Sequence, residues 1–232
     1  MNITTNIRLI IVSSLTACTA LLAMPGTARG QIIYETNSGG NTIGEYDAST
    51  GAAINAALVS GLNLPQDIVV SGGNLWVSNQ SGNTIGEYNA STGATVNASL
   101  VSGLNAPTGI AVSGGNLWVA NNGSNTIGEY NATTGATVNA SLVSGLNGPV
   151  GLEEYGGNLF VSQSGINTIG EYNAVTGATV NASLFSGLNS PTGIEAVPEP
   201  ATWAAGLLAA GTLLGSIWRR RAGWLRHRTQ AC

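Results

Sequence analysis

A 42-residue repeat constrains the fold of this 232-residue chain more than any other feature. The hexapeptide Asn-Thr-Ile-Gly-Glu-Tyr recurs at that constant step, at Asn41–Tyr46, Asn83–Tyr88, Asn125–Tyr130 and Asn167–Tyr172. The proline of a Gly-Leu-Asn-x-Pro motif keeps the same step, at Pro65, Pro107, Pro149 and Pro191. Periods near this length are typical of β-propeller blades and of stacked helical repeats. The chain must therefore fold as copies of one small unit.

Residue patterning favours strands over helices. Short runs rich in Val, Ile, Thr, Tyr and Trp are separated by Gly, Asn and Ser, which predicts three strands at Ile110–Val112, Leu117–Val119 and Thr126–Tyr130. Residues Ala94–Leu100 alternate between apolar and polar side chains, which predicts an outer strand with one solvent-exposed face. A short helical turn over residues 97–104 is the alternative. The expected class is all-β, with four strands per unit.

Two segments of one unit resemble a known repeat. Pro107–Val112 and Gly115–Asn121 are similar to the NHL-type propeller repeat, and the resemblance extends over residues 31–197. It implies four-stranded blades around a central axis, so we expect a small β-propeller of four 42-residue blades. Propellers of this type more often have five to seven blades, and four is the lower limit for a closed ring.

The repeat region begins and ends in the middle of a unit, which favours ring closure. The domain opens with the second strand of a unit, Ile32–Tyr34, and ends with an unpaired first strand, Gly193–Val197. We expect these strands to pair, because pairing removes two exposed sheet edges. If they do not pair, an open repeat stack or a larger ring built from two chains is the better architecture.

Charge and composition limit the chemistry of residues 31–197. All seven Lys or Arg residues of the chain are arginines outside this segment, which also lacks His and Cys but contains most of the acidic residues. An anionic surface without cations predicts no nucleic-acid partner. General-base histidine, Schiff-base lysine and thiolate chemistry are excluded there. The segment has no disulfide, so a packed core alone must hold it together.

Acidic residues supply the candidate sites. The glutamate of the hexapeptide repeats in every unit, at Glu45, Glu87, Glu129 and Glu171. In a closed propeller these glutamates would form a ring that could bind a hard cation such as calcium. The alternative is that each occupies a solvated position on its strand. Glu153 and Glu195 lie on the strand expected nearest the axis, beside Glu154. They form a speculative cation-binding channel mouth of unknown metal, with sequence drift as the alternative. No cofactor is expected beyond weakly bound calcium.

An aromatic side chain also repeats in the second strand of each unit. Exposed rings could stack on sugars, but we favour packing between blades for Tyr34, Trp76, Trp118 and Phe160.

The C-terminal segment has three parts. Val197, Pro198, Glu199 and Pro200 precede an uncharged run over residues 201–218, which is followed by Arg219, Arg220 and Arg221. As a helix the run would reach ~27 Å, about the thickness of a bilayer's hydrocarbon core. The arrangement resembles the PEP-CTERM sorting signal. The resemblance implies an exosortase-type processing partner and a sorting tail over residues 198–232. A plain membrane anchor would need only the apolar run and the arginines.

The N-terminus predicts export as well. A single charge, Arg8, precedes an apolar run and the small residues Gly26–Ala28, as in a secretory signal peptide over residues 1–28. The alternative is a lipoprotein with Cys18 as the lipidated residue.

These features predict an exported, non-enzymatic β-propeller that passes through the inner membrane to the outer envelope or the extracellular matrix. There it would act as a binding or structural module, and the sorting tail implies exopolysaccharide or other envelope components as partners. The alternatives are a lyase or hydrolase that depends on carboxylates and a divalent cation, and a paralogue without a retained role.

Overall fold

The computed structural model describes residues 31–196. The predicted signal peptide, the motif at residues 197–200, the apolar run and the arginine cluster lie outside the described residues. The chain divides into two compact units, Met1–Glu195 and Ala196–Cys232, and the fifteen strands found among the described residues belong to the first. Between residues 31 and 196 no helix is long and apolar enough to cross a membrane. The predicted all-β class is confirmed.

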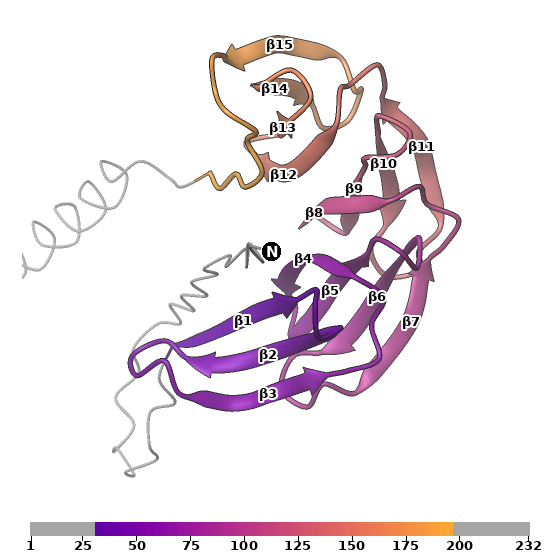
Figure 1. Cartoon of the computed structure of the whole chain (residues 1–232). Coiled ribbons are helices and arrows are strands. Elements are labelled where there is room, and N and C mark those ends of the chain that lie inside the picture. The colour runs from indigo at the N-terminus through magenta and orange to yellow at the C-terminus, as the bar shows by residue number, and fades with distance from the viewer. Residues whose placement is uncertain (1–30, 197–232) are drawn as a thin grey trace, which may run out of the picture. The chain divides into compact units, whose positions relative to one another are not determined.

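The strands form four antiparallel sheets, which we call blades 1 to 4 in chain order (Figure 1). Blade 1 has three strands, β1 (Ile32–Asn37), β2 (Thr42–Asp47) and β3 (Ala53–Val59). Blade 2 has four, β4 (Pro65–Ser71), β5 (Asn74–Asn79), β6 (Thr84–Asn89) and β7 (Thr95–Val101).

Blades 3 and 4 repeat the four-stranded pattern. Blade 3 contains β8 (Pro107–Ser113), β9 (Asn116–Asn121), β10 (Thr126–Asn131) and β11 (Thr137–Val143). Blade 4 contains β12 (Pro149–Tyr155), β13 (Asn158–Gln163), β14 (Thr168–Asn173) and β15 (Thr179–Phe185). Within each blade the strands are paired in chain order, so every blade is a simple meander.

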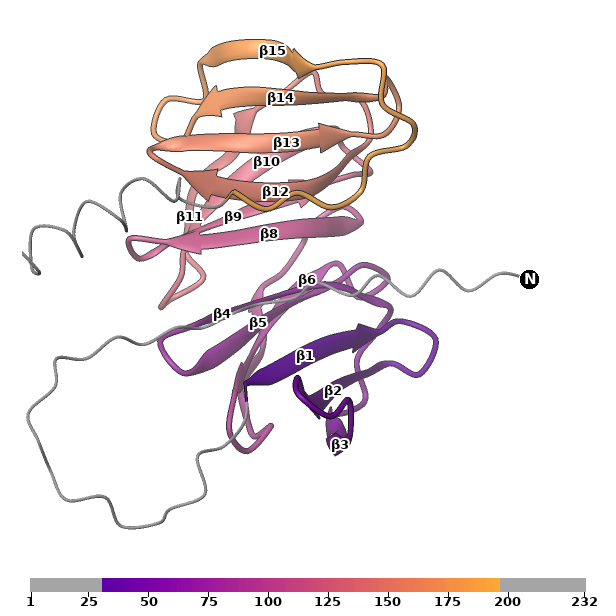
Figure 2. The same ribbon diagram turned by 90° about the vertical axis from the view of Figure 1, so that its left-hand side faces the viewer.

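The blades of the first unit lie side by side in an arc. Their innermost strands contact each other in chain order, β1 with β4, β4 with β8 and β8 with β12. Figure 2 shows these four strands one above another, with blades 1 and 4 at the two ends. The apolar core is accordingly not central but divided into three clusters, each formed by neighbouring blades.

The asparagine that opens each hexapeptide fixes the passage to the next blade. Asn41 adopts a left-handed backbone conformation (φ 55°), and its Oδ1 accepts a hydrogen bond of 2.8 Å from the amide of Leu64, just before β4. Asparagine tolerates this conformation better than most residues. The same bond recurs in the other repeats: Ala106 to Asn83, Gly148 to Asn125 and Ser190 to Asn167.

The repeated aromatic side chains pack between blades. Tyr34, Trp76 and Trp118 are buried. The Tyr34 hydroxyl donates to the carbonyl of Ala90 in the next blade at 2.8 Å, and Trp118 Nε1 donates to that of Ala174 at 3.3 Å. The predicted packing is confirmed for these three. Phe160, in the last blade, is only partly buried.

A glycine completes each contact between blades. A Cβ atom added to Gly135 of blade 3 would lie 1.8 Å from the carbonyl oxygen of Leu100 in blade 2. Gly93 and Gly177 approach the carbonyls of Leu58 and Leu142 in the same way, at 1.9 Å each. No side chain fits in that space, so glycine is required by the neighbouring blade as well as by its positive φ.

The predicted pairing of the chain's two end strands is wrong for the described residues. β1 pairs only with β2, and residues 191–196 form no strand. This segment instead runs beside β12 (Figure 2), and Ser162 Oγ of β13 donates to the carbonyl of Thr192 at 3.5 Å. The reason is that the four blades form an open arc (Figure 1), so β1 and the segment that follows blade 4 lie at opposite ends of it.

The outer strand also differs from its prediction. β7 is a strand, so the helical alternative over residues 97–104 is wrong. Its first five residues are exposed on both faces, and only Leu100 and Val101 are buried. Blades diverge with distance from the axis, so the outer half of this strand has no neighbour to cover either face.

The solvated strand position that was the alternative for the repeated glutamates is wrong for three of the four. Glu45, Glu87 and Glu129 are buried, and Glu171 is partly buried. The side-chain amide of Asn74 donates to Glu87 at 2.6 Å, and that of Asn158 donates to Glu171 at 2.7 Å. Desolvation raises the pKa of Glu129 above its ordinary value.

Replacement of Gly135 by alanine should destabilise the domain more than replacement of Gly103. Both glycines have similar positive φ (69° and 72°), but nothing lies within 4 Å of a Cβ at Gly103. Gly103→Ala should cost ~1–2 kcal/mol of unfolding free energy for the left-handed backbone. Gly135→Ala should cost about 1–3 kcal/mol more through overpacking. Urea unfolding monitored by tryptophan fluorescence measures both, and equal losses would contradict the contact between blades.

Glu129→Gln should change how stability depends on pH. Because the folded state holds the Glu129 proton more tightly than the unfolded state, stability is lost as the pH rises from 4.5 through the raised pKa. Glu129→Gln should remove this loss and raise the melting temperature at neutral pH. Asp47→Asn is the control of opposite sign, since hydrogen bonds from Ser49 and Thr50 lower the pKa of Asp47. Parallel thermal melts that leave the pH profile of Glu129→Gln unchanged would refute the desolvation.

Candidate functional site

A small pocket lies against the innermost strands of blades 2, 3 and 4. Its volume is about 140 Å³, and seven residues line it: Val69, Val70, Ala111, Val112, Glu153, Glu154 and Glu195. They occupy only two positions of the 42-residue repeat: Val69, Ala111, Glu153 and Glu195 share the first, and Val70, Val112 and Glu154 share the second. The pocket therefore follows from the packing of β4, β8 and β12, with the terminal segment beyond β15 adding Glu195.

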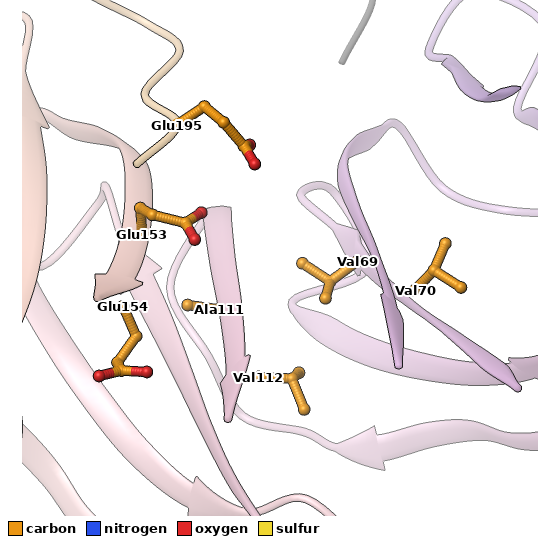
Figure 3. Close-up of a pocket in the computed structure, with 7 residues that line it drawn as sticks. All are labelled: Val69, Val70, Ala111, Val112, Glu153, Glu154 and Glu195. Carbon is orange, nitrogen blue, oxygen red and sulfur yellow. The ribbon is translucent and has the colours of Figure 1, made fainter. Parts of the chain in front are cut away.

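The lining divides into an apolar and an acidic half. Blades 2 and 3 contribute only valine and alanine, whereas β12 and the terminal segment contribute the three glutamates. Figure 3 shows the side chains of Glu153 and Glu195 directed towards a common space, with Val69 facing them. Glu153 and Glu195, which lie 42 positions apart in the sequence, are thus brought to one pocket.

Glu154 has a different local role. Successive side chains of a strand point to opposite faces, and in Figure 3 Glu154 points away from Glu153. Its Oε1 accepts a hydrogen bond of 2.9 Å from the amide of Gly157 in the β12–β13 turn. Glu154 therefore supports this hairpin turn at the edge of the pocket, while Glu153 and Glu195 direct their carboxylates into the common space.

The pocket offers few ligands for a metal ion. Calcium normally takes six to eight oxygen ligands. In the described part of the chain, no group of three or more His, Cys, Asp or Glu residues is arranged to hold a metal ion. The repeated glutamates of β2, β6, β10 and β14 do not line this pocket, so they add nothing to it.

One inner-strand residue was not singled out by the sequence. Asp67 occupies the position held by Gly109 in blade 3 and Gly151 in blade 4. Its Oδ2 accepts a hydrogen bond of 2.9 Å from the amide of Ile110, so a carboxylate links β4 to β8. The sequence could have pointed to Asp67, because this acidic residue stands at a position where two other repeats have glycine.

Solved propeller structures share this architecture. A protein in the crystal structure of a nidogen/laminin complex matches with a TM-score of 0.61 and 19% identity, over 70% of this chain and 62% of that chain. An inactive virginiamycin B lyase from Staphylococcus aureus, with quinupristin, matches with a TM-score of 0.58 and 20% identity, over 74% and 61%. A gluconolactonase from Xanthomonas campestris matches with a TM-score of 0.54 and 18% identity, over 70% and 62%.

These likenesses establish the fold, a propeller-like arrangement of antiparallel blades. The chain spans about three fifths of the length of the structures it matches. No curated protein sequence matches it.

The C-terminal part of the chain has its own match. Residues 196–221 match the family described as the PEP-CTERM protein-sorting motif. They include Val197–Pro200, the apolar run and the three arginines that carried the resemblance in the sequence. The motif indicates recognition by an exosortase-type enzyme, with export and sorting to the cell envelope. The chain thus carries a PEP-CTERM sorting motif behind a domain with a propeller-like fold.

Proposed function

We propose that this protein is a non-enzymatic binding or structural module of the cell envelope. The observation that carries the proposal is the chemistry of the pocket, which is lined by valine, alanine and glutamate alone. Carboxylates beside an apolar wall suit a small cationic or cation-bridged ligand. They offer neither a histidine base nor an amine or thiol nucleophile.

The other repeated groups support the same role. The aromatic side chains of Tyr34, Trp76 and Trp118 could have stacked on sugars, but they are buried between blades. A pocket of about 140 Å³ is smaller than the ~300–1,000 Å³ typical of sites that enclose a drug-sized ligand. We therefore place recognition of large envelope components, such as exopolysaccharide, on the outer surface of the blades.

The sorting motif supplies the route. After export the protein is held in the inner membrane by residues 201–218, cut near Pro198–Pro200 and transferred to the outer envelope or released. The order of motif, apolar run and arginine cluster supports this sequence of events. Neither lipidation at Cys18 nor permanent anchoring is needed for it.

A second candidate function is hydrolysis or elimination assisted by a divalent cation. The propeller-like structures that this chain resembles include a virginiamycin B lyase and a gluconolactonase. In this chain the groups for such a reaction would be Glu153 and Glu195, which face one space (Figure 3). A carboxylate pair with one cation could activate water.

Processing of the tail should depend on the motif. Replacing Pro198, Glu199 and Pro200 with alanine should leave an uncut protein in the inner membrane, because the apolar run and arginines remain. Intact-mass measurement of the surface protein should show the wild type without Arg219–Arg221. A wild-type surface protein that retains the arginines would mean that the tail is a plain membrane anchor.

The domain should show no turnover with calcium, manganese or neither on panels of lactones, esters and glycosides. In a glycan array, saturable binding without product release is the expected result. Glu153→Gln and Glu195→Gln test the alternative, with Glu35→Gln as the control outside the pocket. Turnover that is lost in both pocket variants but kept in Glu35→Gln would establish the enzyme and overturn the binding role.

A further inference from the structure

The outward face of blade 4 exposes positions that every other blade buries. Phe185 is 54% exposed, whereas its equivalents Val59, Val101 and Val143 are 4%, 3% and 3% exposed. Leu188 is 37% exposed, and its equivalents are likewise buried: Leu62, Leu104 and Leu146. In blades 1 to 3 the following blade covers these side chains. Blade 4 therefore presents the apolar half of an interface between blades.

Blade 1 presents the opposite half. Gly51 occupies the position of Gly93, Gly135 and Gly177, but nothing lies within 4 Å of a Cβ there. Tyr46 and Ala48 are only partly buried, whereas Tyr88 and Ala90, their equivalents in blade 2, are buried. The two faces are complementary because each is one side of an interface that the chain already forms three times.

The segment after β15 starts in the position of the innermost strand of a further blade. The carbonyl of Thr192 lies 2.4 Å from a Cβ added to Gly151, as the carbonyl of Val150 lies 2.4 Å from one added to Gly109. Thr192 thus lies against β12 in the same way as Val150 of β12 lies against β8. Residues 193–196 continue from it, and blade 1 is the blade that lacks a fourth strand.

We propose that a second copy of this chain docks on blade 4 and that two copies form one ring. Blade 1 of the second copy packs against Phe160, Phe185 and Leu188, and its β1 pairs with residues 193–196. The register of β4 with β5 gives the pairing when β4 is moved three repeats forward and β5 one repeat back. Ile194 then lies opposite Glu35, and Glu195 lies opposite Tyr34 of the second copy. Each composite blade then has four strands, and the ring has eight blades.

The curvature of the arc favours a second copy over closure within one chain. The four blades form an open arc with blades 1 and 4 at its two ends (Figure 2). Closure within one chain would need a turn of about 90° per blade, the sharpest among rings of four to eight blades, whereas a ring of eight blades needs about 45°. A symmetric ring of two copies also buries both exposed faces of each copy, that of blade 1 and that of blade 4.

Ring closure would complete the acidic pocket. Val69, Ala111, Glu153 and Glu195 are equivalent positions on successive innermost strands. In the ring of two copies these positions line one axis, so each copy brings Glu153 and Glu195 to it.

The test is native mass spectrometry of the full chain released from detergent micelles, with substitutions on β15. The wild type should have the mass of two chains, and Phe185→Glu should raise the dissociation constant at least tenfold. Val180→Glu is the matched control, because Val180 is 55% exposed and its equivalents Val96 and Val138 are exposed as well. Circular dichroism confirms that both variants keep the β fold.

A substitution on the opposite face gives an independent readout. Gly51→Ala should also raise the dissociation constant at least tenfold, since its Cβ would meet the Leu184 carbonyl of the other copy. Gly61→Ala, with a similar φ (74°) and equally open surroundings, should leave it unchanged. A wild-type mass of one chain, a broad series of masses, or equal effects of Phe185→Glu and Val180→Glu would each overturn the proposal.

Discussion

Every other feature of this domain depends on the contact between one blade and the next. The contact has two parts, an aromatic side chain such as Trp118 whose polar atom reaches a carbonyl of the following blade, and a glycine such as Gly135 that admits a carbonyl of the preceding one. A single blade is a thin sheet that cannot bury its faces, so it gains stability only from its neighbours. The same contact sets the angle between blades and hence the curvature of the arc.

That curvature determines what the inner strands can do. Because β4, β8 and β12 converge, the residues one step apart on them meet in one pocket, and Glu153 and Glu195 come together although 42 positions separate them. The valines of blade 2 form the other wall, so the pocket is acidic on one side and apolar on the other. The proposed binding role rests on this arrangement of carboxylates opposite an apolar wall.

The repeat predicted the architecture well, because strand boundaries depend on local patterning. The strands predicted at residues 110–112, 117–119 and 126–130 lie within β8, β9 and β10, and Trp118 packs between blades as expected. Burial of Glu129 was not predictable, because equivalence of positions shows that residues share an environment but not which one. The failed pairing of β1 with residues 193–196 has a similar cause. The angle between blades depends on packing volumes at the interface, and no local pattern encodes it.

The most direct test of this account is hydrogen exchange of backbone amides, measured by mass spectrometry at concentrations where the chain is monomeric. If blades are stabilised by their neighbours, amides of β9, which lies in a blade flanked on both sides, should exchange most slowly. Amides of β1 and β13, in the two end blades, should exchange faster than those of β9. Equal protection of β1, β9 and β13 in the monomer would show that each blade is stable by itself and would contradict the account.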